Sequence, residues 1–235
     1  MGCSIGSSPL LTTSHRYQGA GNSFLIYEEA LPGDPALLAA CGVDGILLLR
    51  GRQLRIYNAD GSEAEMCGNG IRCVVRYLEQ RGMRETRYFF STLAGEIEAW
   101  HEEDVIGVRM PPPRFDRRSP FKERLADFYT VGVPHVVLFF DAIDALDITQ
   151  WADPRYNVNL VQVDEGGVAV RTFERGVNRE TLSCGTGATA AAAAARRHFN
   201  LPDEILVQTR SGAPLMVRFL HERTELIGPA DVVEN

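Results

Sequence analysis

A run of small residues in the last quarter of the chain constrains the fold more than any other feature. The stretch TLSCGTGATAAAAAARRHF occupies 181–199, and its pattern predicts a helix over about 185–199 that ends before Pro202. A helix that is apolar on all sides is a buried helix. Because alanine side chains are small, strands can approach such a helix closely, and we expect β-sheet to surround it.

A second stretch repeats this plan in the first half of the chain. EMCGNGIRCVVRYL over 65–78 again places a cysteine before Gly-X-Gly and an apolar run, which predicts a helix over about 68–82. Close to half the chain length separates Cys67 from Cys184, and strand-like segments flank both motifs. The sequence therefore predicts an α/β (α+β) fold of two pseudo-symmetric domains, each a mixed β-sheet wrapped around a central apolar helix.

The proline run at 111–113 is the best candidate for a domain boundary, because consecutive prolines interrupt both helices and central strands. We expect an N-terminal domain over 1–112 that carries the first cysteine motif and is completed by a C-terminal strand at about 226–235. The second domain is expected over 113–225 and carries the second cysteine motif.

The charge and the segment composition exclude some classes of partner. The formal net charge is −7, whereas a surface that binds nucleic acid normally carries a positive excess, so we expect no nucleic-acid partner. No apolar run reaches the length of a membrane span, and MGCSIGSSPLLTTS lacks the regions of a signal peptide. The five cysteines are odd in number and irregularly spaced, which fits a reducing compartment. We therefore expect a cytoplasmic protein with no membrane partner.

The sequence also argues against common cofactors. Its only lysine is Lys122, in the polar segment RRSPFKERLADF, whereas a pyridoxal phosphate enzyme needs a buried lysine for its Schiff base. The spacing of Cys67 and Cys73 is wider than that of the close cysteine pairs in structural zinc sites. We therefore expect neither a cofactor nor a metal.

Both cysteine motifs combine a thiol with the start of a helix. The first backbone N–H groups of a helix are unpaired and carry partial positive charge, and glycines beside them let an anion approach. The same field lowers the pKa of a thiol, so we expect depressed pKa values at Cys67 and Cys184. Either motif alone is more simply a small core residue before a tight turn, but the repetition favours a function. Cys3, Cys41 and Cys73 are expected to have no chemical role.

Two thiols that face each other across a cleft suit the inversion of a carbon centre. One thiolate removes a proton from one face while the other thiol supplies a proton to the opposite face, and the reverse reaction exchanges their roles. The carbanion between them needs electrostatic stabilisation. Two helix N-termini aimed at a substrate carboxylate can provide it without a cofactor.

These residues resemble the diaminopimelate epimerase family, whose members are amino-acid isomerases that use two cysteines and no pyridoxal phosphate. The blocks that carry the resemblance follow in order along most of the chain: GAGNSF, NADGSEAEMCGNGIRC, PHVV, YNVNLVQV and FERGVNRETLSCGTGA. The resemblance implies interconversion of LL- and meso-2,6-diaminopimelate, for lysine and peptidoglycan precursor synthesis, in a cleft between two pseudo-symmetric domains. It also implies a homodimer.

The resemblance further implies which residues act. Cys67 and Cys184 would be the catalytic pair, and His135 and Glu174 would orient or tune the two thiols. The implied substrate contacts are Asn22, Asn58, Gly68, Asn69, Asn157, Glu174, Arg175, Gly185 and Thr186. Arginine can grip a carboxylate through two parallel hydrogen bonds, and asparagine can bind an ammonium and a carboxylate at once.

Four of these residues have simpler alternatives. Asn58 lies in an Asn-Ala-Asp-Gly turn, where a purely local turn role is open to it. Glu174 and Arg175 form a surface ion pair in the alternative interpretation. His135 would then be a core histidine with satisfied hydrogen bonds.

The chain departs from the family pattern at three places. Gly45 replaces a polar side chain, Val133 replaces an asparagine, and 178–179 holds Asn-Arg where one glycine is usual. A pocket with fewer fixed polar partners discriminates less between ligands. We therefore hypothesise a wider or shifted substrate range, for example towards glutamate.

Three alternative functions stay open at this point. One is a racemase of another amino acid such as glutamate or proline, although the NADGSEAEMCGNG block fits the epimerase better. Another is a non-catalytic amino-acid-binding protein, which would need the anion-binding turns but not both cysteines. A third is a thiol hydrolase that pairs one cysteine with His135 as its base, which would leave the second cysteine motif without a purpose.

Overall fold

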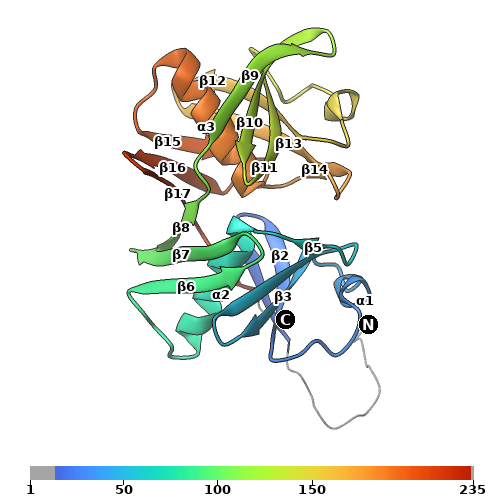
Figure 1. Cartoon of the computed structure of the whole chain (residues 1–235), viewed down its shortest axis with the longest axis vertical. Helices are drawn as coiled ribbons and strands as arrows, with labels where there is room; N and C mark the ends of the chain where they lie inside the picture. Colours follow the sequence, from blue (N-terminus) through green and yellow to red (C-terminus); the bar gives the residue numbers. More distant parts are fainter. Residues whose placement is uncertain (1–13, 234–235) are drawn as a thin grey trace.

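The computed structural model describes residues 14–233 and shows a mixed α/β fold in which strands predominate. Figure 1 shows two lobes, each with strands around one long helix. This arrangement confirms the predicted fold class and the plan of one central helix in each half. The predictions for Cys3 and for the rest of the segment before Ser14 lie outside the described residues.

The first lobe is built from two helices and a set of strands. Its helices are α1 (Pro35–Ala39) and α2 (Gly68–Gln80). Its strands are β1 (His15–Gly19), β2 (Asn22–Glu28), β3 (Gly45–Arg50), β4 (Gln53–Asn58), β5 (Glu63–Ala64), β6 (Arg87–Thr92), β7 (Gly95–Glu102) and β18 (Asp231–Val232).

The second lobe contains α3 (Gly185–Phe199) and a one-turn 3-10 helix at Ile148–Trp151. Its strands are β9 (Arg114–Phe121), β10 (Arg124–Val131), β11 (Val133–Phe139), β12 (Asn157–Asp164), β13 (Gly167–Glu174), β14 (Arg179–Thr181), β15 (Glu204–Gln208) and β16 (Pro214–Leu220). Two further strands, β8 (Val105–Met110) and β17 (Arg223–Gly228), run between the lobes (Figure 1).

The alanine-rich helix is as buried as its composition predicts. α3 begins and ends at the predicted residues, and its alanines are buried except Ala193. It contacts β10, β11, β12, β13, β15 and β16, so sheet surrounds it on several sides. The helix ends at Asn200, which adopts a left-handed conformation with φ 51°, and asparagine tolerates that conformation better than most residues.

The helix of the first lobe is buried on all sides over its first two turns, because every residue from Gly68 to Val75 is buried. α2 packs against β1, β2, β7, β8 and β18, and Cys73 is fully buried, as expected of a packing residue. The helix ends close to Gly82, whose positive φ of 77° is a conformation that glycine adopts without strain. No helix within 14–233 is long and apolar enough to cross a membrane.

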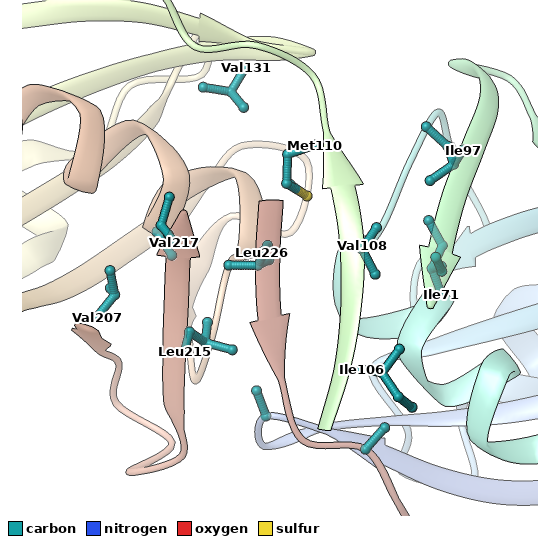
Figure 2. Close-up of a cluster of buried hydrophobic side chains, with 14 of the residues drawn as sticks. Ile71, Ile97, Ile106, Val108, Met110, Val131, Val207, Leu215, Val217 and Leu226 are labelled. Carbon is teal, nitrogen blue, oxygen red and sulfur yellow. The ribbon is translucent and has the colours of Figure 1, made fainter. Parts of the chain in front are cut away.

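The strands β8 and β17 join the two lobes through a continuous core. They pair antiparallel, with Leu226 opposite Val108. Figure 2 shows Leu226 with Val108 and Ile106 on one side and Leu215 and Val217 on the other. All five are buried members of one apolar cluster that also includes residues of α2 and α3. This shared core fixes the two central helices relative to each other.

The chain returns to the first lobe at its C-terminal end, where β18 pairs with β1 and Val232 lies opposite Tyr17. The C-terminal strand expected at about 226–235 is shorter in the structure, because β17 ends at Gly228 and β18 covers only Asp231–Val232. Pro229 follows β17 and has no N–H to offer a strand ladder. The domain division at 112 and 113 stays a prediction.

Candidate active site

Cys67 and Cys184 occupy the same local position in the two lobes. Each is the N-cap residue of its helix, with an extended backbone at φ −143° for Cys67 and −126° for Cys184. The Cys67 Sγ accepts a hydrogen bond from the Gly70 N–H at 3.4 Å. The Cys184 Sγ accepts one from the Gly187 N–H, also at 3.4 Å. Each thiol thus replaces the side-chain oxygen that usually caps a helix.

The two helix starts meet at Leu226 of β17. A Cβ at Gly68 would lie 3.3 Å from the Leu226 Cδ2, and one at Gly185 would lie 2.8 Å from it. The same Cβ position at Gly185 is 3.9 Å from the Gly68 Cα. Glycine at both positions therefore allows the N-termini of α2 and α3 to approach, and their partial positive charges converge on one region.

Two adjoining cavities bring the predicted substrate contacts together. The smaller cavity has a volume of about 90 Å³ and is lined by both thiols together with Asn22, Asn58, Gly68, Asn69, Glu174, Gly185 and Thr186. The larger cavity has a volume of about 470 Å³ and is lined by Asn157 and Arg175. The two cavities share several lining residues, namely Asn58, Met66, Cys67, Glu174, Val177 and Thr186. A ligand in this space would reach both lobes.

The pKa values of both thiols are raised, which corrects the expectation drawn from the helix field. Burial raises the pKa of Cys67 to about 11, although the Gly70 N–H and the Arg72 guanidinium act in the opposite direction. Burial and the Glu174 carboxylate raise the pKa of Cys184 well above its usual value. The prediction of depressed pKa values was wrong because the loss of water destabilises the thiolate more than one helix N–H stabilises it.

Glu174 is the carboxylate that lies next to a thiol. It adjoins the Cys184 thiol, because each group affects the pKa of the other, and the Thr181 hydroxyl donates to its Oε1. Burial raises the pKa of Glu174, while the Thr181 hydroxyl and the Cys184 thiol lower it. Within 14–233 the carboxylate of Glu174 makes no ion pair with Arg175, so the surface-pair interpretation is wrong. The arrangement allows a proton to pass between Cys184 and Glu174.

His135 lies on β11 behind the cavities and lines neither of them. Burial, together with the positive charge of Arg175, lowers the pKa of His135 to about 3, so the ring is neutral at neutral pH. Its Nδ1 lies 3.2 Å from the Asn159 Nδ2. Its Nε2 is buried and has no hydrogen-bond partner among the described residues. The interpretation of His135 as a fully satisfied core histidine is therefore wrong.

Asn69 links the two cysteine turns. Its Nδ2 donates to the Asn22 Oδ1 at 2.9 Å and to the Ser183 carbonyl at 3.4 Å, next to Cys184. Its Oδ1 accepts from the Arg72 Nη2 at 2.7 Å. Asn69 is only 2% exposed, so its side chain holds the start of α2 against the segment that leads into α3. Substrate contact by Asn22 and Asn69 stays a prediction.

The remaining predicted contacts lie around both cavities. The Asn58 Nδ2 donates to the Ser62 Oγ at 3.0 Å, which is the local turn role, yet Asn58 also faces both cavities. The Asn157 Oδ1 accepts from the Arg175 N–H at 2.9 Å. The Thr186 Oγ1 lies 3.4 Å from the Cys184 Sγ. These bonds hold the side chains in place, and their contacts with a substrate stay predictions.

Comparison with known proteins decides the family. The family model for diaminopimelate epimerase matches residues 41–115 and 128–233. A diaminopimelate epimerase of Methanocella arvoryzae is 37% identical over an alignment that covers 93% of each chain. Another, of a Nitratiruptor species, is 35% identical and covers 88% of this chain and 91% of its own. The chain belongs to the diaminopimelate epimerase family.

Solved structures of distant sequence share the fold of this diaminopimelate epimerase family member. A predicted epimerase from Pseudomonas aeruginosa has a TM-score of 0.74 at 14% identity, with 94% of this chain and 98% of that chain covered. A hydroxyproline epimerase from Agrobacterium vitis has a TM-score of 0.68 at 15% identity, with 94% and 90% covered. These likenesses confirm the fold, and the family confirms the prediction of an epimerase.

The departures from the diaminopimelate epimerase pattern lie in different surroundings. A Cβ at Gly45 would lie 2.7 Å from the Tyr57 carbonyl oxygen and 3.2 Å from the Phe24 ring, and Gly45 lines neither cavity. The backbone there is therefore closed against a side chain. Val133 lines the larger cavity and contributes an apolar wall. A wider substrate range stays a prediction.

The third departure contributes to an ion pair that sequence reasoning missed. The Arg179 Nη2 lies 3.0 Å from the Asp44 Oδ1, and both residues line the smaller cavity from opposite lobes. The Asp44 Oδ2 in turn accepts from the Ser23 N–H at 2.9 Å. The extra residue at 178–179 was a visible signal, but no sequence pattern points to its partner, which lies in the other half of the chain.

Proposed function

We propose that this chain interconverts LL- and meso-2,6-diaminopimelate through two cysteine thiols that act on opposite faces of the α-carbon. The observation that carries the proposal is the pair of N-cap thiols, Cys67 and Cys184, that line one small cavity at two converging helix N-termini. An α-carbon in this cavity would have a thiol from each lobe beside it. General acid–base catalysis by such groups is worth about 10²–10⁴-fold in rate.

The helix N-termini support the binding and the activation of the substrate. The first N–H groups of the two helices, at Gly68, Asn69, Gly185 and Thr186, are the groups that an α-carboxylate would bind. The same groups stabilise the negative charge that spreads onto the carboxylate as the α-proton leaves. The chain's own residues thus provide carbanion stabilisation.

The charged neighbours of the thiols give the proton transfers an order. Glu174 accepts the proton of Cys184, and the resulting Cys184 thiolate removes the α-proton from one face. The Cys67 thiol then supplies a proton to the opposite face, and the Arg72 guanidinium favours the thiolate that remains there. The reverse reaction begins from the Cys67 thiolate. Each direction moves one proton onto one thiol and one proton off the other.

The larger cavity supports a long amino acid with a second polar end. Its volume of about 470 Å³ exceeds that of the smaller cavity, and it is lined by Arg175, Asn157 and Asn58. A guanidinium and two amides can hold a distal carboxylate and ammonium. This feature supports diaminopimelate over glutamate, whose side chain is shorter.

We also propose the finer features of the family resemblance for this chain. They are a homodimer in solution, a cytoplasmic location, and two domains over 1–112 and 113–225 with the C-terminal segment added to the first. The return of β18 to β1 supports the last of these. Light scattering of the purified chain tests the dimer.

The proposed function is tested by the conversion of LL-diaminopimelate to the meso isomer, with reductant and no added cofactor. We expect the wild type to catalyse the conversion, and Cys67→Ala and Cys184→Ala each to lose at least about 10²-fold of the rate. Cys41→Ala is the matched control, because Cys41 is exposed and lines neither cavity. Full turnover by either cavity variant would contradict the proposal. No turnover by the wild type would leave the amino-acid-binding protein as the better interpretation.

A further inference from the structure

A polar patch lies beneath the first turn of α3, in an otherwise apolar sheet face. Val137, Val161 and Val170 belong to the apolar cluster that contains the α3 alanines. Nearer the helix start, His135 and Asn159 take their place, and both are completely buried. Buried polar side chains at the base of a candidate active site need a physical explanation.

The side-chain amide of Asn159 is held in one orientation. Its Nδ2 donates to the Val136 carbonyl at 3.0 Å and lies 3.3 Å from the Asn157 carbonyl. Its Oδ1 accepts from the Thr172 hydroxyl at 2.9 Å. Reversing the amide would set its oxygen against two carbonyl oxygens. The NH₂ group therefore faces β11 and the oxygen faces β13.

This orientation dictates which nitrogen of His135 carries the proton. The His135 Nδ1 lies 3.2 Å from the Asn159 Nδ2, whose two hydrogens are shared among this nitrogen and the two carbonyls and which has no lone pair to accept. An Nδ1–H would point at that NH₂ group, so Nδ1 is the acceptor and the ring proton is on Nε2. The buried Nε2–H has no acceptor among the residues of 14–233.

The same amide also supports the turn that holds Cys184. A Cβ at Gly187 would lie 2.6 Å from the Asn159 Oδ1 and 2.8 Å from the Thr172 Oγ1. Gly187 is the residue whose N–H donates to the Cys184 Sγ. Asn159 therefore contacts the cap of α3 on one side and His135 on the other.

We propose that Asn159 is a positioning residue that fixes His135 as the neutral Nε2–H tautomer, so that the ring beneath the first turn of α3 is a hydrogen-bond donor and not a proton acceptor. The proposal does not depend on the proposed function. A neutral ring whose Nδ1 is occupied is not the proton acceptor of a thiol. The thiol hydrolase with His135 as its base is therefore excluded by the same geometry.

The test is the ¹⁵N NMR spectrum of the full-length chain with labelled histidine, recorded without substrate. The spectrum of His135→Gln identifies the signals of this ring among the five histidines. We expect coupling patterns of an Nε2–H tautomer that persist from pH 8 to pH 5. An Nδ1–H tautomer, or a ring that becomes charged over this range, would overturn the proposal.

Two variants separate positioning from general structural support. Asn159→Asp replaces the donor by an acceptor, and we expect the proton to move to Nδ1 or the ring to become charged. Thr172→Val removes only the bond to the Asn159 Oδ1, and we expect the Nε2–H tautomer to remain. The same change of tautomer in both variants, or in neither, would overturn the role of Asn159. If Asn159→Asp does not fold, the wild-type spectrum and Thr172→Val still decide.

Because the tautomer is measured without substrate, this proposal and the proposed function fail separately. An active epimerase with an Nδ1–H ring would overturn this proposal alone. An Nε2–H ring in a chain that does not act on diaminopimelate would support it and contradict the function.

Discussion

The two cysteine turns have the same backbone and different chemical surroundings. Both begin a helix with Cys-Gly-X-Gly, and both thiols accept from the third N–H of the helix. The X position is Asn69 in the first lobe, where it is buried and hydrogen-bonded to both lobes, and Thr186 in the second, where it faces both cavities. The first cysteine turn thus holds the two lobes together at the site in addition to carrying a thiol.

The charges that act on the two thiols differ, because Glu174 acts on both thiols and Arg72 only on Cys67. Arg72 is a fully buried cation that lowers the pKa of Cys67, although the Glu174 charge raises that pKa by more. Glu174 is an acid next to Cys184, and it raises the pKa of that thiol while offering an acceptor for its proton. The repeated motif gives both thiols the same backbone position. Their different roles in giving up and supplying a proton depend on the side chains that the fold places beside them.

The largest expected effect on activity is that of removing the Glu174 carboxylate beside Cys184. Glu174→Gln should lower kcat/KM for LL-diaminopimelate at pH 7 by at least about 10²-fold, because no carboxylate then takes the Cys184 proton. Activity should recover towards alkaline pH, where the Cys184 thiol, whose pKa is raised by burial, ionises without a carboxylate to take its proton. Glu165→Gln, in the exposed turn between β12 and β13, is the control. A loss that is equal at every pH would show that Glu174 has another role.

The next largest effect is a difference in stability between alanine variants at Asn69 and at Thr186. Asn69→Ala should lower the free energy of unfolding by about 2–3 kcal/mol, because it removes a bond to the buried Arg72 and the link to Ser183. Thr186→Ala should change stability by less than about 0.5 kcal/mol and act mainly on kcat. Urea unfolding of both variants measures the difference. Equal destabilisation would contradict the division of roles.

Between pH 7 and pH 5, the stability of the protein should depend on the buried histidine of the second lobe and not on the buried arginine of the first. The pKa of His135 is 6.5 in the unfolded chain and about 3 in the folded chain, so the unfolded state binds more protons between these values. The contribution of His135 is therefore complete above about pH 6.5 and falls by about 2 kcal/mol between pH 7 and pH 5. Glu174, whose folded pKa is raised, acts in the opposite sense. Urea unfolding of the wild type and of His135→Gln at both pH values isolates the histidine; an identical pH dependence would contradict its buried neutral state.

The smallest expected effect is at the ion pair that joins the lobes. A double-mutant cycle with Asp44→Ala and Arg179→Ala should give a coupling energy of about 0.2–1 kcal/mol, because the pair is partly exposed. The exposed pair Arg52–Glu85, within the first lobe, is the matched control. We expect the effects on KM for diaminopimelate to be non-additive for Asp44 and Arg179 and additive for Arg52 and Glu85. Coupling of both cycles in KM would show that the first pair has no special connection with the cavity.

The sequence predicts the elements that local pattern determines. The alanine run and the two Gly-X-Gly motifs place α2 and α3 to within a few residues, and the cysteines fall at the N-caps because a residue before two glycines and an apolar run begins a helix. The spaced apolar residues of 141–152 are typical of a helical region, but only the 3-10 turn at Ile148–Trp151 forms.

The features that depend on tertiary contact could not be predicted. The pKa values of both thiols are raised, whereas the sequence predicted lowered values. The thiols are buried because the two lobes meet at Leu226, which the sequence does not show. Asn159 lies in YNVNLVQV, which predicts a strand but not that its amide faces His135 on the neighbouring strand. The partner of Arg179 is likewise set by the way the lobes dock.

The central claim is that two thiols act on opposite faces of the α-carbon. The most direct test measures, early in a reaction in D₂O, whether deuterium enters the product, the remaining substrate, or both. LL-diaminopimelate is incubated with the enzyme to low conversion, and substrate and product are separated and analysed by mass spectrometry. With Cys67 and Cys184 as two separate bases, the meso product carries one deuterium at its inverted carbon and the recovered LL substrate carries none. Deuterium in the recovered substrate at the same rate as in the product would contradict the account, because one group would then remove and return the proton.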